Sequence, residues 1–354
     1  MIDSITTVEH VRAATATADS SVALEVRNLT TEFSTRQGPL PAVDGVSFCV
    51  PKGRVLAVIG ESGSGKSAML RSIIGIQPKT ARVGGDVFLA GRNLMTVSSR
   101  ARERIRGRDI SMVFQDPLTA LDPVYTVERQ LTETIRRHHH MNRTAAKVRA
   151  VELLDLVQIP SPAARLKAYP SELSGGMRQR VVIAMAIAGR PQVLLADEPT
   201  TALDVTVQAR IIALFRQIQR ENDMGVVVVT HDLGVAAELA DDIAVMYAGR
   251  FVEYGSAADV LRRSDHPYTE GLVGANVHTG QTDRPLSILG APPNLTRLPP
   301  GCAFAPRCPH ASVDCWARLP EVVHVTDDHW SRCFYSPRHV DVALSRKQDV
   351  DVAV

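Results

Sequence analysis

The sequence predicts an α/β fold in which a parallel sheet is preceded by an antiparallel β subdomain and interrupted by a helical subdomain. The runs "RVLAVIG", "VLLAD" and "GVVVVTH" are short and apolar, as buried parallel strands are. Helical segments lie between them, which is the pattern of an α/β domain. A glycine-rich segment follows the first run directly and is the first candidate for a binding site.

Length and composition are those of a globular protein of about two domains. The chain has 354 residues, of which 45% are hydrophobic and 22% charged, with a formal net charge of +2. Because the charges nearly balance, we expect no nucleic-acid partner. The longest apolar runs fall far short of the roughly 20 residues that cross a bilayer, and the N-terminus lacks the apolar core of a secretory signal. We therefore expect a cytoplasmic protein without a membrane span.

Two segments before the glycine-rich loop alternate apolar and polar residues as half-buried strands do: "ALEVRNLTTEF" and "AVDGVSFCV", joined by a turn at "STRQGPLP". Pro and Gly become dense towards the C-terminus, which predicts a second, smaller module. The expected segments are a loose N-terminal tail (1–22), a main domain (23–265) with a helical subdomain (about 117–190), a small Cys-containing extension (266–338) and a C-terminal tail (339–354).

The segment "GESGSGKS" has the spacing of a phosphate-binding loop. Its glycines let the backbone curl so that amide groups point at phosphate oxygens, and the following helix adds positive potential at its N-terminus. Lys66 would reach the β- and γ-phosphates, and Ser67 would ligate Mg2+. The residues expected to contact ATP here are Gly60, Glu61, Ser62, Gly63, Ser64, Gly65, Lys66, Ser67 and Ala68.

The segment "VLLADEPT" supplies the acidic half of such a site. Its apolar run carries a strand to Asp197, whose carboxylate can hold Mg2+ through water. Glu198 comes next, and a carboxylate beside the γ-phosphate can orient and polarise the attacking water as a general base. An Asp-Glu pair alone is also typical of a solvated acidic turn. The phosphate loop earlier in the chain favours the catalytic interpretation.

Between these two segments lies "LSGGMRQR", residues 173–180, and here the sequence resembles the signature motif of the ATP-binding cassette superfamily. The resemblance implies an ATP-binding cassette core and an ATPase that uses Mg2+. It also implies that the signature contacts the ATP of a partner cassette, through Ser174, Gly175, Gly176 and Met177. Met177 stands where many members have glutamine, but the ligand-facing groups are the serine and the glycine amides.

Other positions of this family follow in order along the chain. The resemblance implies that Gln115 contacts Mg2+ and joins the helical subdomain, and that His231 is a switch residue at the γ-phosphate. Phe33 is the aromatic residue expected to stack on adenine, with an ordinary strand aromatic as the alternative. The loop expected to contact the partner cassette contains Ala202, Leu203 and Asp204.

Two cassettes pack head to tail in this family, so neither alone completes an ATP site, and ATP binding closes the pair. The resemblance therefore implies a second ATPase subunit, either a related chain or an identical copy. The segments "VFQDPLTALDPVYTV", "HPYTEGL" and "PPGCAFAPRCP" resemble the ATPases of oligopeptide, dipeptide and nickel importers. Asp122 stands where asparagine is more usual.

This second resemblance implies a subunit that hydrolyses ATP to power import of oligopeptides or dipeptides. Its partners would be two transmembrane permease subunits and, indirectly, an extracytoplasmic solute-binding protein. It would lie peripherally on the cytoplasmic face of the membrane. Import of nickel or another small solute is one alternative. A soluble cassette ATPase acting in translation or DNA repair, and a redox-sensing regulatory protein, are two others.

Four of the five cysteines lie near the C-terminus with the spacing C-x5-C-x6-C-x17-C. Disulfides are rare in the cytoplasm, and structural zinc usually takes close pairs such as C-x2-C, which this segment lacks. A 4Fe-4S cluster needs four thiolates and accepts a range of spacings, and some peptide-importer ATPases carry one in this extension. We therefore expect such a cluster, with zinc or no metal as alternatives. The expected ligands are Cys302, Cys308, Cys315 and Cys333.

The remaining cysteine and the histidines have plainer interpretations. Cys49 is expected to be a small buried hydrophobic residue in a strand. The run of three histidines at 138–140 is expected to form a solvated basic patch, because adjacent residues on a helix face different directions. His310, His324 and His329 lie near the cysteines in sequence and rank below them as ligands.

Overall fold

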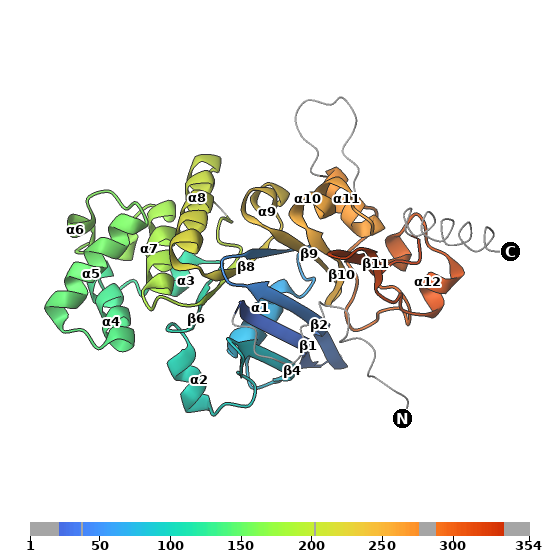
Figure 1. The fold of residues 1–354 in the computed structure, drawn as a ribbon, viewed down its shortest axis with the longest axis horizontal. Helices are drawn as coiled ribbons and strands as arrows, with labels where there is room; N and C mark the ends of the chain where they lie inside the picture. Colours follow the sequence, from blue (N-terminus) through green and yellow to red (C-terminus); the bar gives the residue numbers. More distant parts are fainter. Residues whose placement is uncertain (1–20, 37, 202, 276–287, 336–354) are drawn as a thin grey trace.

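The computed structural model describes residues 21–36, 38–201, 203–275 and 288–335. These residues form a larger mixed sheet, a smaller antiparallel sheet and a group of helices (Figure 1). One group of helices lies at the left end of the view, and the C-terminal part of the described chain lies at the right end. The two sheets lie between these ends.

The larger sheet contains the apolar runs of the sequence. Its strands, in spatial order, are β11 (Val323–Thr326), β12 (His329–Ser331), β10 (Arg250–Ser256), β9 (Asp242–Tyr247), β3 (Val55–Ile59), β8 (Gly225–Thr230), β7 (Val193–Asp197) and β6 (Ile110–Val113). Strands β3, β8 and β7 pair in parallel, and all their residues are buried. Strands covered on both faces have no side for polar residues, which explains why these runs do not alternate. The predicted parallel core is confirmed.

The smaller sheet is antiparallel, as predicted. Its strands, in spatial order, are β2 (Gly38–Pro51), β1 (Val22–Thr35), β4 (Ala81–Leu89) and β5 (Arg92–Asn93). The long turn expected at "STRQGPLP" is wrong, because β1 runs to Thr35 and β2 begins at Gly38. Gly38 has a φ of 112°, which glycine adopts without strain. The prolines that suggested a loop are tolerated because β2 is an edge strand.

The helices are α1 (Lys66–Ile74), α2 (Ser99–Ile105), α3 (Pro117–Ala120), α4 (Val127–His139), α5 (Arg143–Leu156), α6 (Pro162–Arg165), α7 (Gly175–Ile187), α8 (Val205–Asn222), α9 (Leu233–Leu239), α10 (Ala257–Arg262), α11 (Pro267–Ala275) and α12 (Val313–Ala317), with short 3-10 turns η1 (Pro170–Glu172) and η2 (Ala305–Arg307). Helices α3 to α7 occupy the range expected for the helical subdomain. Polar side chains cap the starts of the longer ones: Thr126 on α4, Asn142 on α5 and Ser174 on α7. Buried leucines such as Leu131 and Leu153 join α4 and α5 to one core.

The C-terminal segment continues the larger sheet. Strand β12 pairs antiparallel with β10, so that Trp330 lies opposite Tyr254. Their rings stack at a centroid distance of 6.0 Å. The cysteine-bearing region is therefore attached to the larger sheet through backbone pairing, which fixes its position relative to the other strands.

A buried polar network reinforces this attachment. The Glu253 carboxylate, on β10, accepts hydrogen bonds from the backbone N–H groups of Asp265 (2.8 Å) and His266 (3.0 Å). The same carboxylate lies 2.8 Å from Nε2 of His329 on β12, and both side chains are almost fully buried. A buried carboxylate needs such partners, because an unpaired charge in the interior is very costly.

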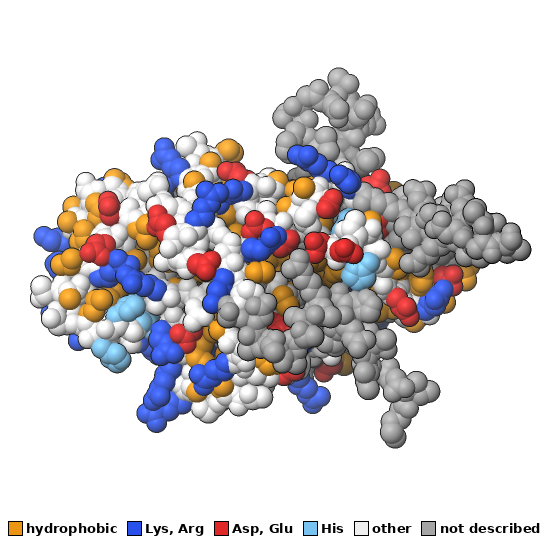
Figure 2. Space-filling view, viewed as in Figure 1, with side chains coloured by type: hydrophobic (Ala, Val, Ile, Leu, Met, Phe, Trp, Pro, Cys, Tyr) orange, Lys and Arg blue, Asp and Glu red, His pale blue; other side chains and the backbone are white. Residues whose placement is uncertain are grey.

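The surface carries both signs of charge. On the face shown in Figure 2, lysine and arginine side chains are interspersed with aspartate and glutamate over the described part of the chain. No single basic face is visible among the described residues in that view, in line with the small net charge. None of the described helices combines the length and the hydropathy that crossing a bilayer requires.

We expect Glu253→Ala to lower the free energy of unfolding by about 3–5 kcal/mol, because it leaves His329 and two N–H groups buried without their acceptor. Asp314→Ala is the matched control: its ion pair with Arg318 is exposed, and its loss should cost less than about 1 kcal/mol. Denaturant titration of the two purified variants measures both values. Equal losses would show that the buried network does not hold the C-terminal segment.

Candidate active site

The phosphate loop connects the end of β3 to the start of α1, as the sequence predicts. Gly60 and Gly65 have φ values of 154° and 108°. A Cβ atom on Gly60 would collide with the backbone oxygen of Met246, and one on Gly65 with that of Ala42. Any side chain at either position would therefore push the loop off the strands beneath it. The two glycines are required by close backbone approach as well as by conformation.

Lys66 lies inside the curl of this loop. Its amine donates to the backbone oxygens of Gly60 (2.7 Å) and Glu61 (2.8 Å), and its side chain is buried. Burial lowers the pKa of Lys66, while the charges of Glu198 and Asp197 act to raise it. The amine is thus held beside both acidic residues of the site.

Ser67 and Asp197, the residues expected to hold Mg2+, lie side by side. The Ser67 hydroxyl donates to Oδ1 of Asp197 at 2.7 Å. Asp197 is fully buried, and its Oδ2 has no hydrogen-bond partner within the described residues. Burial raises the pKa of this carboxyl. A buried, unpartnered carboxylate oxygen beside a serine hydroxyl is a donor set that suits a hard divalent cation.

Three catalytic candidates meet at the Glu198 carboxylate. Gln115 and Thr201 each donate to its Oε2 at 2.9 Å, and Nδ1 of His231 lies 3.3 Å from its Oε1. Glu198 has a φ of 47°, a conformation that is uncommon for a residue with a side chain. Such strain at the end of a buried strand is typical of functional positions. Gln115, Glu198 and His231 come from distant parts of the chain, and the structure places them together.

The signature residues lie elsewhere in the molecule, at the start of α7. The Ser174 hydroxyl accepts a hydrogen bond from the Met177 N–H, and a Cβ on Gly176 would collide with Val207 on α8. Asp204 caps the start of α8 by accepting from the Val207 N–H at 2.9 Å. The signature helix and the expected dimer loop are therefore packed against each other. Of that loop, Ala202 lies outside the described residues.

The remaining candidates of the nucleotide site occupy less constrained positions. Phe33 is half-buried on β1, where it pairs with Leu40 of β2 and Ala81 of β4. Ser64 is buried, with its hydroxyl 3.4 Å from the Lys66 amine. The other loop positions are either exposed or half-buried: Glu61, Ser62, Gly63 and Ala68.

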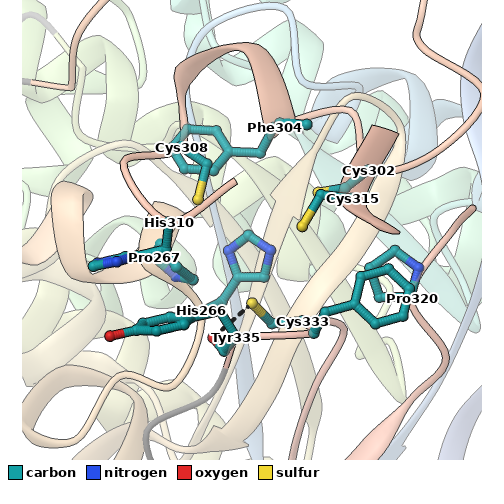
Figure 3. Close-up of a pocket in the computed structure, with 12 residues that line it drawn as sticks. His266, Pro267, Cys302, Phe304, Cys308, His310, Cys315, Pro320, Cys333 and Tyr335 are labelled. Atoms are coloured by element: carbon teal, nitrogen blue, oxygen red, sulfur yellow. Dashed lines mark hydrogen bonds between the residues drawn. The ribbon is translucent and has the colours of Figure 1, made fainter. Parts of the chain in front are cut away.

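The four C-terminal cysteines line one cavity, which is otherwise largely apolar (Figure 3). All four are free thiols, Cys302 and Cys308 partly exposed and Cys315 and Cys333 buried. The backbone N–H and the hydroxyl of Ser312 both lie 3.4 Å from Sγ of Cys315. Within the described ranges, no three His, Cys, Asp or Glu side chains are placed to hold a single metal ion. The cysteines therefore share a cavity without converging on one point.

His266 also lines this cavity, and sequence reasoning missed it. In Figure 3 its imidazole lies among the cysteine side chains. Nδ1 accepts a hydrogen bond from the Tyr268 N–H at 3.1 Å, while the buried Nε2 has no partner among the described residues. Burial lowers the His266 pKa to about 4, so the ring is neutral near pH 7 and Nε2 carries its proton. The signal for it in the sequence is "HPYTEGL", the segment that resembles importer ATPases.

The other histidines occupy varied surroundings. His310 lines the cavity and stacks on Tyr335 at 4.0 Å, whereas His329 pairs with Glu253, and His324 lies on β11. The three consecutive histidines point different ways, but the expected solvated basic patch is wrong for His138 and His139, which are half-buried. The first packs against Gly107, the second lies 2.7 Å from a backbone oxygen in the turn after α7, and the third is exposed at the end of α4.

Comparison with known proteins agrees with this geometry. The chain matches the ABC transporter family over residues 43–201 and the C-terminal region of oligopeptide/dipeptide transporters over residues 252–315. It is 46% identical to the dipeptide transport ATP-binding protein DppD of Bacillus subtilis, over 91% of this chain and 97% of the relative. It is 45% identical to the oligopeptide transport ATP-binding protein OppD of Salmonella typhimurium, over 86% of this chain and 91% of the relative.

A solved structure shares the nucleotide-binding part of the fold. It is a dimeric ATP-binding cassette in a post-hydrolysis state with ADP and Pi bound, 29% identical, with a TM-score of 0.60 over 66% of this chain and 98% of that one. The fold, the residues that meet at the phosphate loop and the C-terminal region thus all indicate the same family. The chain belongs to the ATP-binding cassette family, in its group of oligopeptide and dipeptide transport ATP-binding proteins.

Proposed function

We propose that this chain binds and hydrolyses ATP to power import of oligopeptides or dipeptides through partner permease subunits at the cytoplasmic face of the membrane. The observation that carries the proposal is the C-terminal region shared with oligopeptide/dipeptide transporters, joined to a complete phosphate-loop half-site. A nickel importer shares the segment after Gln115 and is the alternative. The names of the relatives favour peptides.

In this proposal the residues at the strand ends divide the work of hydrolysis. Lys66 and the loop amides bind the phosphates, and Ser67, Asp197 and Gln115 would hold Mg2+. Mg2+ held by these residues would supply positive charge that offsets the negative charge developing on the phosphates during hydrolysis. Glu198 orients and polarises the attacking water. His231 lies 3.3 Å from the Glu198 carboxylate and holds that carboxylate beside the γ-phosphate.

A second cassette is needed to complete each ATP site. The Ser174 hydroxyl and the amides of Gly175 and Gly176 stand at the N-terminus of the 13-residue helix α7, which is a favourable position for binding phosphate. They would contact ATP held on the phosphate loop of a partner, with Leu203 and Asp204 lining the contact between the cassettes. The dimeric relative bound to ADP and Pi supports this arrangement.

We expect Glu198→Gln to lower the rate of ATP hydrolysis at least about a hundredfold while ATP binding is retained, because the amide cannot act as a base. The matched control is Glu238→Gln, which changes an exposed carboxylate on α9. Phosphate release by the chain with its partner cassette measures hydrolysis, and nucleotide titration measures binding. Near wild-type turnover in Glu198→Gln would show that the general base is another group.

The surface beside Gln115 suits a membrane partner. Phe114 and Val124 lie within the segment that resembles importer ATPases, and they are 37% and 67% exposed. Apolar side chains at such a position are a natural seat for a short helix from a permease subunit. The coupling contact would lie here, next to Gln115, which donates to the Glu198 carboxylate and would help to hold Mg2+.

We expect Val124→Asp to reduce co-purification with permease subunits, and ATP-driven peptide uptake into vesicles, by about fivefold or more, with ATP binding unchanged. Val148→Asp is the control, since Val148 is 58% exposed on α5, away from that segment. Uptake of nickel but not of peptides would select the alternative importer. Recovery with ribosomes or DNA and without permeases would refute the transport proposal.

We further propose that the cysteine-lined cavity holds a 4Fe-4S cluster. Three observations support the fit: four thiols face one cavity, the buried Nε2–H of His266 lacks a partner among the described residues, and Ser312 offers donors to Cys315. A 4Fe-4S cluster needs four thiolate ligands, and four cysteines line this one cavity. Bound there, it would supply a cross-link to a Pro-rich segment with little core of its own.

Protein purified without oxygen should contain about four irons and four acid-labile sulfides per chain, with a broad visible absorbance. Cys308→Ser should lose most of the iron. Cys49→Ser should keep it, because Cys49 lies half-buried in β2, outside the cavity. Metal and sulfide analysis decides the matter: one zinc without sulfide identifies a zinc site, and protein free of metal refutes the cluster.

A further inference from the structure

An ion pair joins the cysteine-bearing segment to the phosphate loop. Arg307 ends η2, immediately before Cys308, and its guanidinium donates to both carboxylate oxygens of Glu61, at 2.7 and 2.9 Å. Glu61 is the second residue of the phosphate loop. The Arg307 side chain is only 6% exposed. A two-point contact of this kind fixes orientation as well as distance, and partial burial protects it from screening by salt.

Further contacts fix Arg307 in place. Its Nε donates to the backbone oxygen of Leu289 at 2.9 Å, and its Nη1 lies 3.4 Å from the Tyr247 hydroxyl. The guanidinium is therefore bound on several sides by groups of the cassette and the C-terminal segment. A planar, permanently charged group with this set of partners has little freedom to turn away from the loop.

The backbone of residue 61 is held from the same side. The Glu61 N–H donates to the Tyr268 hydroxyl at 2.8 Å. The Tyr268 ring packs against Tyr247 (4.5 Å between centroids) and Phe304 (5.4 Å). Phe304 also lines the cysteine cavity. One aromatic group thus touches the cavity on one side and the first turn of the phosphate loop on the other.

The charge of Glu61 gives the ion pair a consequence for the nucleotide. The Glu61 carboxylate is close enough to Lys66 to act on its amine, together with the carboxylates of Asp197 and Glu198. Left unpaired, Glu61 would place negative charge beside the site that binds phosphates. Arg307 neutralises that charge and draws the side chain towards the C-terminal segment.

We propose that Arg307 is a positioning residue through which the cysteine-bearing segment sets the affinity of the phosphate loop for ATP. The inference rests on ATP binding at this loop and does not require that the transported solute be a peptide. It assigns the C-terminal segment a role in nucleotide binding, in addition to its attachment through β12. Disorder or oxidation at the cysteines would weaken ATP binding through this contact.

The test compares ATP dissociation constants of full-length variants, after the wild-type chain has been shown to bind ATP. Arg307→Gln should raise the constant about five- to tenfold, a typical size for coupling between two sites. Arg307→Lys keeps the charge without the two-point geometry and should recover part of the loss. Arg318→Gln, a change of an exposed arginine in the same segment, should leave the constant within about twofold of wild type.

Variants of Glu61 test whether Arg307 acts by neutralising the Glu61 charge. Glu61→Gln should raise the constant less than Arg307→Gln, because it also removes negative charge from the loop. The double variant should bind ATP no more weakly than Arg307→Gln alone. Additive losses, or wild-type affinity in Arg307→Gln, would overturn the proposal. Thermal unfolding of each variant separates these effects from a general loss of folded protein.

A cysteine variant tests whether the cavity acts on ATP binding through Arg307. Cys308→Ser should weaken ATP binding in the wild-type background and have little further effect in the Arg307→Gln background, because the connecting contact is already lost. Equal effects in both backgrounds would show that the cavity acts on the nucleotide by another route and would refute the role given to Arg307. Failure of the wild-type chain to bind ATP would instead refute the proposed function.

Discussion

The register of three parallel strands determines where the chemistry takes place. Ile59 pairs with Thr230 and Asp197 pairs with Val229, so β3, β8 and β7 end at the same level of the sheet. The phosphate loop, the proposed general base and the proposed switch histidine each follow one of these ends directly. A shift of one residue in any pairing would turn a catalytic side chain to the opposite face. Catalytic geometry is thus a consequence of backbone pairing, and the buried valines and leucines that hold the strands serve the site as well as stability.

The site is built at a cost in solvation that a ligand would offset. Burial lowers the pKa of Lys66 and raises that of Asp197, so each charged form is disfavoured by its surroundings. The two opposite charges partly compensate each other, yet one oxygen of Asp197 keeps no partner among the described residues. The free energy of these buried charged groups is lower when phosphate and a divalent cation are bound beside them than when the site is empty. Nucleotide binding should therefore stabilise the folded cassette in addition to driving its movement.

Local patterns in the sequence predicted the parallel strands, the phosphate loop and the acidic strand end, because each is encoded within about ten consecutive residues. The hairpin was predicted less well, since Pro-rich sequence indicates a loop unless the strand is known to lie at an edge. The buried network of Glu253 and the contact between Arg307 and Glu61 could not be predicted. Their partners lie 76 and 246 residues apart, and no local pattern marks a residue as the partner of a distant one. His266 illustrates the same limit, because its role is visible only when the cavity around it is seen.

The arrangement places the phosphate loop between two kinds of control. On one side, Gln115 links the Glu198 carboxylate to the segment that we assign to the permease contact. On the other, Arg307 and Tyr268 hold the first turn of the loop from the C-terminal segment. The two connections reach different parts of one site: the first touches the group that acts on water, the second the loop that binds phosphate. An input through the first would therefore change the rate of hydrolysis, whereas an input through the second would change how tightly ATP is held. Separate connections allow a transporter subunit to adjust nucleotide occupancy without altering its chemical step.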